Sequence, residues 1–354
     1  MIDHAEHLAK LVSQVRASDW LAIDTEADSL HAYPEKLCLL QISIPGVDAL
    51  VDPLAGLDMS ALLSALRGRE LILHGADYDL RLLYRTFRFV PDAVFDTMLA
   101  ARFLGHMEFG LTHLVNKFLG VGLEKGPQKM DWAQRPLTPR MEAYARNDTR
   151  YLAPLAEILR AQLREKGRLE WHRETCSRLI KECARERIEN PDQVWRIKGS
   201  DRLDRPALAI LKELWKWREQ EAIETNTPPY FILSHELLVA LSDAAARGKS
   251  TAALLPPRIS AKRKSRLLSA IEGGSRTPAS QHPERRRTVG RRLTAVEQSR
   301  FDALKKRRDE RAARLELDPT LIASRAALVD LARDSDAGDH ELMDWQRLLL
   351  RSAD

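Results

Sequence analysis

The chain has 354 residues, three cysteines and a net charge of +5, from 56 Lys and Arg residues against 51 Asp and Glu residues. This length suggests two or three domains, and three scattered cysteines are too few for a disulfide framework. No stretch reaches the roughly 18 apolar residues of a membrane helix, and the charged N-terminus lacks the apolar region of a signal peptide. We therefore expect a cytoplasmic protein that does not associate with membranes.

The charge is distributed unevenly along the chain. Residues 1–170 contain 20 basic and 23 acidic side chains, whereas residues 171–354 contain 36 basic and 28 acidic ones. A basic half is typical of nucleic-acid-binding proteins, but solvated charged helices produce the same small surplus.

The sequence pattern of residues 1–170 predicts an α/β domain. Apolar periodicity indicates helices and strands in the following order: a helix over 3–17, strands over 20–24, 37–44 and 49–51, a helix over 57–67, a strand over 70–74 and a helix from Asp77. Three strands followed by helices and strands in alternation favour a mixed sheet covered by helices. From about residue 96 the pattern is helical, apart from a loop at 120–136.

The sequence pattern of residues 171–354 predicts helices. Residues 203–272 and 293–354 each contain a long charged helix, an extended stretch with proline and a Leu-rich helix, which makes a weak internal repeat. Residues 171–202 are expected to be a helical connector. Residues 273–292 have almost no apolar side chains and predict a flexible basic linker.

Two pairs of acidic residues follow strands of the predicted sheet. Asp24 and Glu26 are separated by one residue at the end of the first strand, so both side chains point to one face. Two carboxylates at one place favour a bound cation, although a solvated strand end is the simpler alternative. Asp77 and Asp79 follow the strand at 70–74, where Asp77 could cap a helix and Asp79 would lie in its first turn.

A third group lies in the helix expected from Pro139. Tyr144 and Asp148 are four residues apart, so both lie on one face of that helix. A phenol and a carboxylate one turn apart can face one site, or can simply lie at the surface.

Taken together and in this order, these residues resemble the tyrosine branch of the DEDD exonuclease superfamily. The segments LCLLQIS, HGADYDLRLL, FDTMLAARFLG, GLTHLVNKFLGVGLEK, DWAQRPLT and YARNDTRYL are similar to ribonuclease D over about residues 18–160. The histidine branch carries His one residue before the tyrosine position, where this chain has Ala143. The resemblance implies a ribonuclease-H-like α/β fold with helices on both faces of a mixed sheet.

The resemblance also implies a mechanism. Asp24, Glu26, Asp79 and Asp148 would hold two divalent ions, Mg²⁺ or Mn²⁺, for which oxygen ligands are suited, and Tyr144 would orient the attacking water or polarise the scissile phosphate. Such a pair of ions supports hydrolysis of a phosphodiester bond. Further substrate contacts are expected from a backbone position and four side chains: Thr25, His74, Lys125, Lys129 and Arg135.

Residues 203–270 resemble the HRDC domain, the small helical module of ribonuclease D and RecQ helicases. The similar segment is LAILKELWKWREQEAIETNTPPYFILSHELLVALSDAAARG. It is followed by five basic residues that could contact a nucleic-acid backbone: Arg258, Lys262, Arg263, Lys264 and Arg266. A plain packing module is an equal alternative. Residues 293–354 look like a second, more diverged copy.

The resemblance therefore implies a monomeric 3′→5′ exoribonuclease that trims RNA 3′ ends, with tRNA precursors as the expected substrate. The same chemistry on DNA and a non-catalytic RNA-binding scaffold are the alternatives. No ATP site is expected, because the segment Gly248-Lys249-Ser250-Thr251 lacks the earlier glycine and the preceding strand of a phosphate-binding loop.

Overall fold

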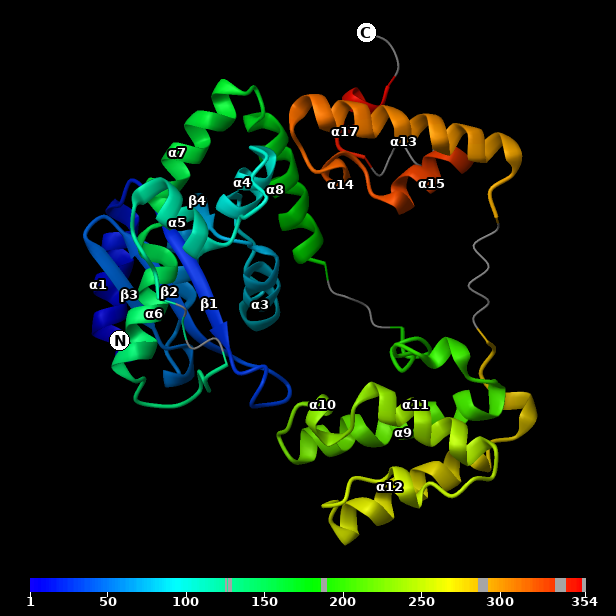
Figure 1. Cartoon of the computed structure of the whole chain (residues 1–354). Helices are drawn as coiled ribbons and strands as arrows, with labels where there is room; N and C mark the ends of the chain where they lie inside the picture. Colours follow the sequence, from blue (N-terminus) through cyan, green and yellow to red (C-terminus); the bar gives the residue numbers. More distant parts are fainter. Residues whose placement is uncertain (125, 127–128, 186–189, 286–291, 335–341, 352–354) are drawn as a thin grey trace. The chain divides into compact units, whose positions relative to one another are not determined.

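The computed structural model describes residues 1–124, 126, 129–185, 190–285, 292–334 and 342–351 (Figure 1). The chain forms two compact units. Unit 1 comprises Met1–Ala27, Leu37–Glu186 and Arg291–Asp354, and unit 2 comprises Asp28–Lys36 and Arg187–Gly290. Within the described residues, no helix combines the length and the apolar character needed to cross a membrane.

A five-stranded mixed sheet organises unit 1. The sequence predicts the mixed sheet and four of its strands. Its strands are β1 (Ala22–Ala27), β2 (Leu37–Ile44), β3 (Val47–Val51), β4 (Glu70–Leu73) and β5 (Ala93–Asp96), in the spatial order β3-β2-β1-β4-β5. The pairs β1–β2 and β2–β3 are antiparallel, whereas β1–β4 and β4–β5 are parallel. The periodicity analysis did not identify β5.

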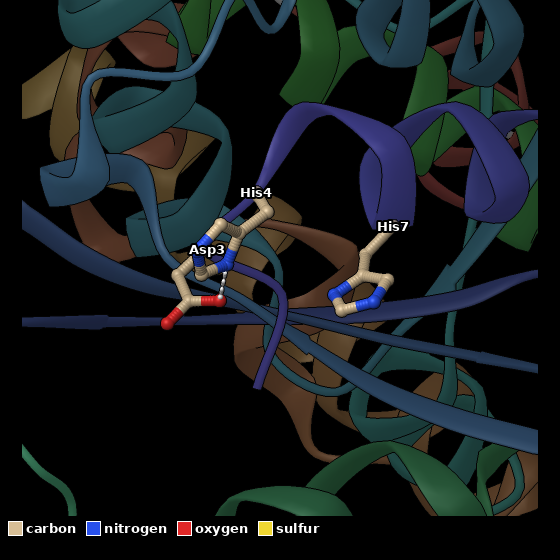
Figure 2. Close-up of side chains that lie close together, drawn as sticks. All are labelled: Asp3, His4 and His7. Atoms are coloured by element: carbon tan, nitrogen blue, oxygen red, sulfur yellow. Dashed lines mark hydrogen bonds and ion pairs between the residues drawn. The ribbon is translucent and has the colours of Figure 1, made fainter.

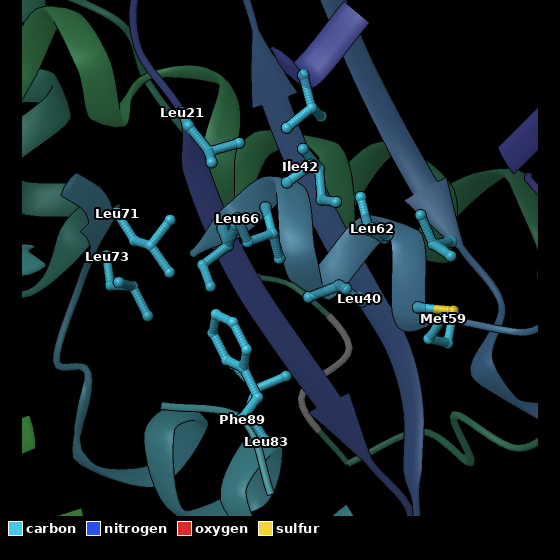
Figure 3. Close-up of a cluster of buried hydrophobic side chains, with 14 of the residues drawn as sticks. Leu21, Leu40, Ile42, Met59, Leu62, Leu66, Leu71, Leu73, Leu83 and Phe89 are labelled. Atoms are coloured by element: carbon cyan, nitrogen blue, oxygen red, sulfur yellow. The ribbon is translucent and has the colours of Figure 1, made fainter. Parts of the chain in front are cut away.

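Eight helices accompany this sheet in chain order: α1 (Ala5–Ala17), α2 (Ser60–Leu66), α3 (Asp77–Phe87), α4 (Thr97–Phe103), α5 (Leu111–Leu119), α6 (Pro139–Arg150), α7 (Leu152–Glu165) and α8 (Leu169–Cys183). A 3₁₀ turn spans Pro53–Ala55. Figure 3 shows Leu40 and Ile42 of β2 beside Leu62 and Leu66 of α2 in the core of one layer. Leu39, which alternates with Leu40 along the strand, packs instead with Met141 of α6.

This alternation places the acidic residues of β1. Asp24 pairs with Gln41 and Glu26 with Leu39 across the antiparallel ladder. Cross-strand partners lie on the same face of a sheet, so both carboxylates share the face of Leu39, which α6 covers. The two clusters of apolar residues thus bury opposite faces of β2, and the register directs Asp24 and Glu26 toward α6.

The helical part of the chain contains the same module twice. The first helical module consists of α9 (Arg205–Glu224), α10 (Pro229–Ile232), α11 (His235–Ala246) and α12 (Ala261–Ser275), and the second consists of α13 (Ala295–Leu315), α14 (Pro319–Ile322), α15 (Arg325–Arg333) and α17 (Asp344–Leu350). Short 3₁₀ turns span Ser200–Arg202, Ala252–Leu254 and Ala279–Gln281.

The two modules also share their internal hydrogen bonds. Nη1 of Arg218 donates to the carbonyl of Leu233, and Nη1 of Arg308 donates to the carbonyl of Ala323. In both modules a serine caps the third helix, which is Ser234 in the first and Ser324 in the second. The weak sequence repeat therefore corresponds to a structural repeat.

Two predicted boundaries differ from the structure. The predicted connector over 171–202 begins inside α8, and Cys176, Ile180 and Cys183 of that helix belong to the core of unit 1. The predicted flexible linker over 273–292 begins inside α12. There the backbone of Gly274 packs so closely on α9 that an added Cβ would lie 2.5 Å from Cα of Ile210. This tertiary contact, which low hydrophobicity does not reveal, keeps residues 273–275 in the helix. Residues 286–291 of the predicted linker lie outside the described residues.

The second helical module packs into unit 1. Trp345 of α17 stacks on Trp171 of α8, with ring centroids 5.2 Å apart, and meets the edge of Phe103 at 5.3 Å. The buried guanidinium of Arg168 donates to the carbonyl of Phe103 and to that of Leu315, each at 2.7 Å. These contacts join residues of α4, α8, α13 and α17 in one core.

Candidate active site

Three carboxylates from two elements converge at the site. The ligand oxygens of Asp24 and Glu26 on β1 and of Asp148 on α6 all lie within 4.8 Å of one another. The three side chains are half-buried, so they combine access to solvent with a low-dielectric surrounding. The amide of Gln41 on β2 donates to Oδ2 of Asp24 at 3.3 Å and holds that carboxylate in place.

Asp79 supplies the fourth carboxylate from the first turn of α3. Its side chain is buried, and its Oδ1 accepts a hydrogen bond from Oγ1 of Thr25. The residue that caps α3 is Ala76, so the expectation that Asp77 caps the helix is wrong. Asp77 instead pairs with Arg81 one turn later. The start of α3 is held by Asp96, whose carboxylate accepts from the backbone N–H groups of Gly75 and Ala76.

Burial is the largest cause of a raised pKa for each of these four carboxyl groups. Burial, followed by the charges of Asp79, Asp148 and Glu26, raises the pKa of Asp24 well above its usual value. Burial and the charges of Asp148 and Asp79 raise the pKa of Glu26 to about 9, and burial and the charge of Asp79 raise that of Asp148 to about 7. Burial, with a smaller contribution from the charge of Asp96, raises the pKa of Asp79 to about 6. Hydrogen bonds from Thr25 to Asp79 and from Tyr144 to Asp148 partly offset the rise. Such a group is stable in its ionised form only beside positive charge.

Asp24, Glu26 and Asp148 line a cavity of about 1060 Å³. Among the described residues that line it, five side chains are acidic and none is Lys or Arg: the acidic ones are Asp24, Glu26, Glu108, Glu124 and Asp148. A polyanion can approach these carboxylates only when cations neutralise them. The all-oxygen donor set fits Mg²⁺ or Mn²⁺.

Tyr144 lies one helical turn before Asp148 and lines the same cavity. Its phenol donates to the carboxylate of Asp148. Its ring centroid lies 6.1 Å from that of Trp132, which is buried as a packing anchor. The ring also packs against Gly126, and a Cβ added to that residue would lie 1.6 Å from Cδ2 of Tyr144.

His74 also reaches the cavity, from the end of β4. Oγ1 of Thr97 donates to the carbonyl of Leu73, so it accepts from Nδ1–H of His74 at 2.9 Å. Burial lowers the pKa of His74. The neutral ring with its proton on Nδ1 therefore has an acceptor lone pair at Nε2.

The remaining expected substrate contacts have different outcomes. The hydroxyl of Thr25 is used by Asp79, so a contact to substrate would come from its backbone. Lys125 lies outside the described residues, and Lys129 is exposed in the same loop. Arg135 is committed to the fold, because its guanidinium donates to both carboxylate oxygens of Asp52 and to the carbonyls of Cys38, Trp132 and Gln134. This arrangement uses the donors of Arg135 within the protein, and the expected phosphate contact is corrected accordingly.

One wall of the cavity was not predicted. Polar residues of α5 line it, namely Thr112, His113 and Asn116, together with Asn147 of α6. Thr112 and Asn116 are four residues apart and therefore share one face of α5. This spacing is visible in the sequence, but only the tertiary structure shows that the face points toward the carboxylates.

A second group of possible metal ligands lies at the start of α1. Asp3, His4 and His7 bring ligand atoms within 4.8 Å of one another, and Figure 2 shows the hydrogen bond between Asp3 and His4. All three side chains are exposed. Water can solvate exposed groups of this kind without a metal, so this cluster differs from the half-buried carboxylates of the cavity.

Two family models match separate parts of the chain. A model described as 3′-5′ exonuclease matches residues 1–164, and the HRDC domain model matches residues 207–256. The second helical module lies outside both matches. The first match contains Asp24, Glu26, Asp79, Tyr144 and Asp148.

Curated relatives and solved structures extend this similarity. Ribonuclease D of Zymomonas mobilis is 37% identical over 248 residues, which cover 68% of this chain and 63% of that protein. Ribonuclease D of Acidiphilium cryptum is 31% identical over 295 residues, or 80% of this chain and 74% of that protein. The crystal structure of Escherichia coli RNase D superposes with a TM-score of 0.74 at 26% identity, covering 100% of this chain and 92% of that one. The chain thus spans less than two thirds of the Zymomonas relative.

Proposed function

The chain belongs to the ribonuclease D family, and we propose that it is a metal-dependent 3′→5′ exoribonuclease that releases nucleoside 5′-monophosphates from RNA 3′ ends. The observation that carries the proposal is the convergence of Asp24, Glu26 and Asp148 in one cavity, with Tyr144 beside them. Hydrolysis of a phosphodiester needs positive charge near the scissile phosphate, and this group of carboxylates is built to hold it.

We propose two Mg²⁺ or Mn²⁺ ions as the cofactors, held by Asp24, Glu26, Asp79 and Asp148. Bound ions of this type activate a water molecule and stabilise the developing charge on the leaving oxygen. The protein supplies the geometry: β1 presents two carboxylates, α6 a third and the first turn of α3 the fourth. Gln41 and Thr25 fix the rotamers of Asp24 and Asp79 through hydrogen bonds.

Tyr144 positions the reactants in this proposal. A tyrosine with a pKa near 10 is a poor general base at neutral pH, whereas its phenol can hold a water molecule or a phosphate oxygen by a hydrogen bond. Because Asp148 accepts from the phenol, the hydroxyl is already directed toward the carboxylates. Removal of the hydroxyl should lower kcat more than it raises KM.

The test uses 5′-labelled single-stranded RNA and the purified full chain. Mg²⁺ or Mn²⁺ should produce a ladder that shortens from the 3′ end, and EDTA should abolish it. Asp24→Asn should lower kcat at least about 1000-fold, and Tyr144→Phe about 10- to 100-fold. If Asp24→Asn shortens the RNA as fast as the parent protein, the carboxylates are not the active site.

The same chemistry on DNA is the alternative function, and His74 provides a reason to favour RNA. The acceptor at Nε2 of the neutral ring suits a ribose hydroxyl, and the 2′-hydroxyl is the group that distinguishes RNA from DNA. Matched RNA and DNA oligonucleotides should show a preference for RNA that His74→Ala reduces. Equal rates on both substrates would favour the general exonuclease.

The finer expectations concern the natural substrate and setting. We propose that the enzyme acts on tRNA precursors in the cytoplasm as a monomer. Sequencing of cellular RNA 3′ ends with and without the gene should show extended tRNA precursors in its absence. Sedimentation velocity of the purified chain should give one species of 40.2 kDa.

A further inference from the structure

One wall of the catalytic cavity has uncharged polar side chains to which the proposed mechanism assigns no role. Thr112 and Asn116 of α5 and Asn147 of α6 line the cavity together with the acidic residues. The phosphates of a nucleic acid are bound mainly by Lys and Arg, and none of the described residues that line this cavity is Lys or Arg. A wall of amides and a hydroxyl instead suits the uncharged polar parts of a substrate, which are its nucleobases and ribose hydroxyls.

The amides of Asn116 and Asn147 are available to a ligand. Neither side chain forms a hydrogen bond or an ion pair within the part of the chain that the structure describes. By contrast, the amide of Gln41 in the same site donates to Oδ2 of Asp24. Each available amide offers two N–H donors and an oxygen acceptor.

The other polar side chains of α5 in this wall offer less. Nδ1 of His113 lies 3.4 Å from Oε2 of Glu108, so this ring has a partner within the protein. Thr112 lies one turn before Asn116 and has a single hydroxyl. The two amides therefore provide most of the unused hydrogen-bonding capacity of the wall.

The backbone of Asn116 is fixed by the core and by the end of its helix. Leu114 and Val115, which precede it on α5, are fully buried. The carbonyl of Asn116 accepts from the N–H of Gly120, which ends α5 in the left-handed conformation with a φ of 68°. A rigid helix therefore presents this amide to the cavity, and rigid support is what a precise binding contact requires.

Asn147 lies between the two functional residues of α6. It follows Tyr144 by three residues and directly precedes Asp148, and all three line the cavity. Thr149 anchors this turn, because its buried hydroxyl forms a hydrogen bond of 2.7 Å with that of Ser43 on β2. A substrate group that contacts Asn147 is therefore close to the catalytic carboxylates.

The freedom of an amide determines which bases it accepts. An amide held by a protein hydrogen bond presents its donor and its acceptor in one order, and so it reads one pattern on a base edge. A free amide can turn by about 180° around its last torsion angle, which exchanges the two groups. It can then pair with the adjacent donor and acceptor of any of the four bases. Two free amides accordingly favour contacts to bases without a preference among them.

We propose that Asn116 and Asn147 bind nucleobases at the 3′ end of the RNA and lower KM without selecting a sequence. This inference rests on the proposed function, because it assigns a role within the same cavity. The bases do not change when the phosphodiester bond breaks, so a contact to them is equally strong before and during the reaction. Loss of such a contact raises KM and leaves kcat unchanged.

The test measures hydrolysis of RNA trinucleotides by the full chain with Mn²⁺. Asn116→Ala and Asn147→Ala should each raise KM about five- to tenfold, with kcat within about twofold of the parent value. The increase in KM should be equal for trinucleotides that end in A, C, G or U. An unchanged KM in both variants, or an increase confined to one base, would overturn the proposal.

Abasic substrates separate a contact to a base from a structural role, because the change in the protein and the change in the substrate form a double-mutant cycle. Two trinucleotides are needed, one abasic at the last position and the other at the next-to-last position. For each amide, one of them should raise KM of the parent chain and remove the further increase caused by the Asn→Ala change. An increase that persists in full on both abasic trinucleotides would overturn the proposal.

Asn190→Ala is the matched control. Asn190 is exposed and lies outside the lining of the cavity, and its side chain accepts from the N–H of Asp192. Its replacement should leave KM unchanged on every trinucleotide. An equal rise of KM in this variant would show that the effect does not come from the cavity wall and would contradict the assignment.

The outcome is separable from that of the proposed function. Hydrolysis by the parent chain tests the exonuclease, whereas Kd of a labelled trinucleotide, measured by fluorescence anisotropy with Ca²⁺ in place of Mn²⁺, tests the base contacts alone. A chain that hydrolyses nothing, but whose Kd rises in both Asn variants on intact and not on abasic RNA, would support the contacts and contradict the exonuclease. A chain that hydrolyses RNA with an unchanged KM in both variants would do the reverse.

Discussion

Tyr144 occupies a position that depends on the absence of a side chain at Gly126. A Cβ at that residue would lie 1.6 Å from one ring carbon and 1.8 Å from another, so either the ring or the loop must move. Because the phenol must be placed within a few tenths of an ångström, a shift of about 1 Å can cost about 100-fold in rate.

Gly126→Ala should therefore lower kcat by about 10- to 100-fold, with a smaller change in KM and an unchanged melting temperature. Steady-state kinetics on single-stranded RNA measure the effect. Gly122→Ala in the same loop is the matched control, since a Cβ there meets no atom within 4 Å. Equal activity of the two variants would show that the loop moves to accommodate the new Cβ and that Tyr144 keeps its position.

The raised pKa values of the carboxyl groups predict how stability depends on pH. The folded values of about 6 for Asp79, 7 for Asp148 and 9 for Glu26 exceed the unfolded values near 4. The metal-free folded state therefore binds more protons than the unfolded state above pH 4, and stability falls as pH rises from there through the folded pKa values.

The metal-free protein should lose several kcal/mol of unfolding free energy between pH 5 and pH 8. Urea titrations in EDTA at several pH values measure this loss. Mg²⁺ should restore most of it at pH 8, and Asp148→Asn should flatten the dependence. If the unfolding free energy in EDTA does not change over this pH range, folding does not raise the pKa values of these carboxyl groups.

Asp96 connects three elements of unit 1 at the junction of β5 and α4. Its buried carboxylate caps α4 by accepting from the N–H groups of Met98 and Leu99, and it also accepts from Gly75 and Ala76 before α3. The second pair of hydrogen bonds, which fixes the first turn of α3 and hence Asp79, depends on the parallel pairing of β4 and β5.

Asp96→Ala should lower the free energy of unfolding by at least about 2 kcal/mol, because four backbone donors lose their acceptor. It should also weaken binding of Mn²⁺ through the displacement of Asp79. Urea unfolding and calorimetric titration measure the two effects. Asp58→Ala, which removes an exposed bond to the N–H of Ser60, should have the smaller effect on stability and none on Mn²⁺. A comparable loss of Mn²⁺ affinity in both variants would contradict the link.

The parts of the fold and site that the sequence predicted are those set by local periodicity. The alternation along β1 directs Asp24 and Glu26 to one face, and the helical turn aligns Tyr144 with Asp148. Strand β5 was missed because three apolar residues followed by Asp96 at the start of a helix do not distinguish a strand from a helix start. The commitment of Arg135 to Asp52 depends on a contact between residues 83 apart, which no local pattern contains.

At the scale of the whole molecule, the chain contains two helical modules with the same internal hydrogen bonds and different surfaces. The first is basic and exposes Tyr230 and Phe231. The second has no net charge and contributes Phe301, Trp345 and Leu350 to the core of unit 1. The buried Arg168 connects this core to the end of α13 through uncharged carbonyl acceptors. Composition alone suggested only that both copies were helical and charged.

The docking of the second helical module predicts a specific loss of stability. Trp345 is 3% exposed and fills the space between Trp171 and Phe103. Trp345→Ala should lower the free energy of unfolding of unit 1 by about 3–5 kcal/mol, as measured by urea unfolding of the full chain. Leu348→Ala, a truncation on the same helix at a residue that is 72% exposed, should change it by less than about 0.5 kcal/mol.

The Trp345→Ala variant should lose activity only where it unfolds, because Trp345 lies in a packed core and outside the lining of the catalytic cavity. At a temperature where the Trp345→Ala variant is fully folded, its kcat on a trinucleotide should match the parent value. If the variant unfolds at the same urea concentration as Leu348→Ala, the second helical module is not docked in solution. A lower kcat of the fully folded Trp345→Ala variant would show instead that packing of the second helical module affects the position of the catalytic carboxylates.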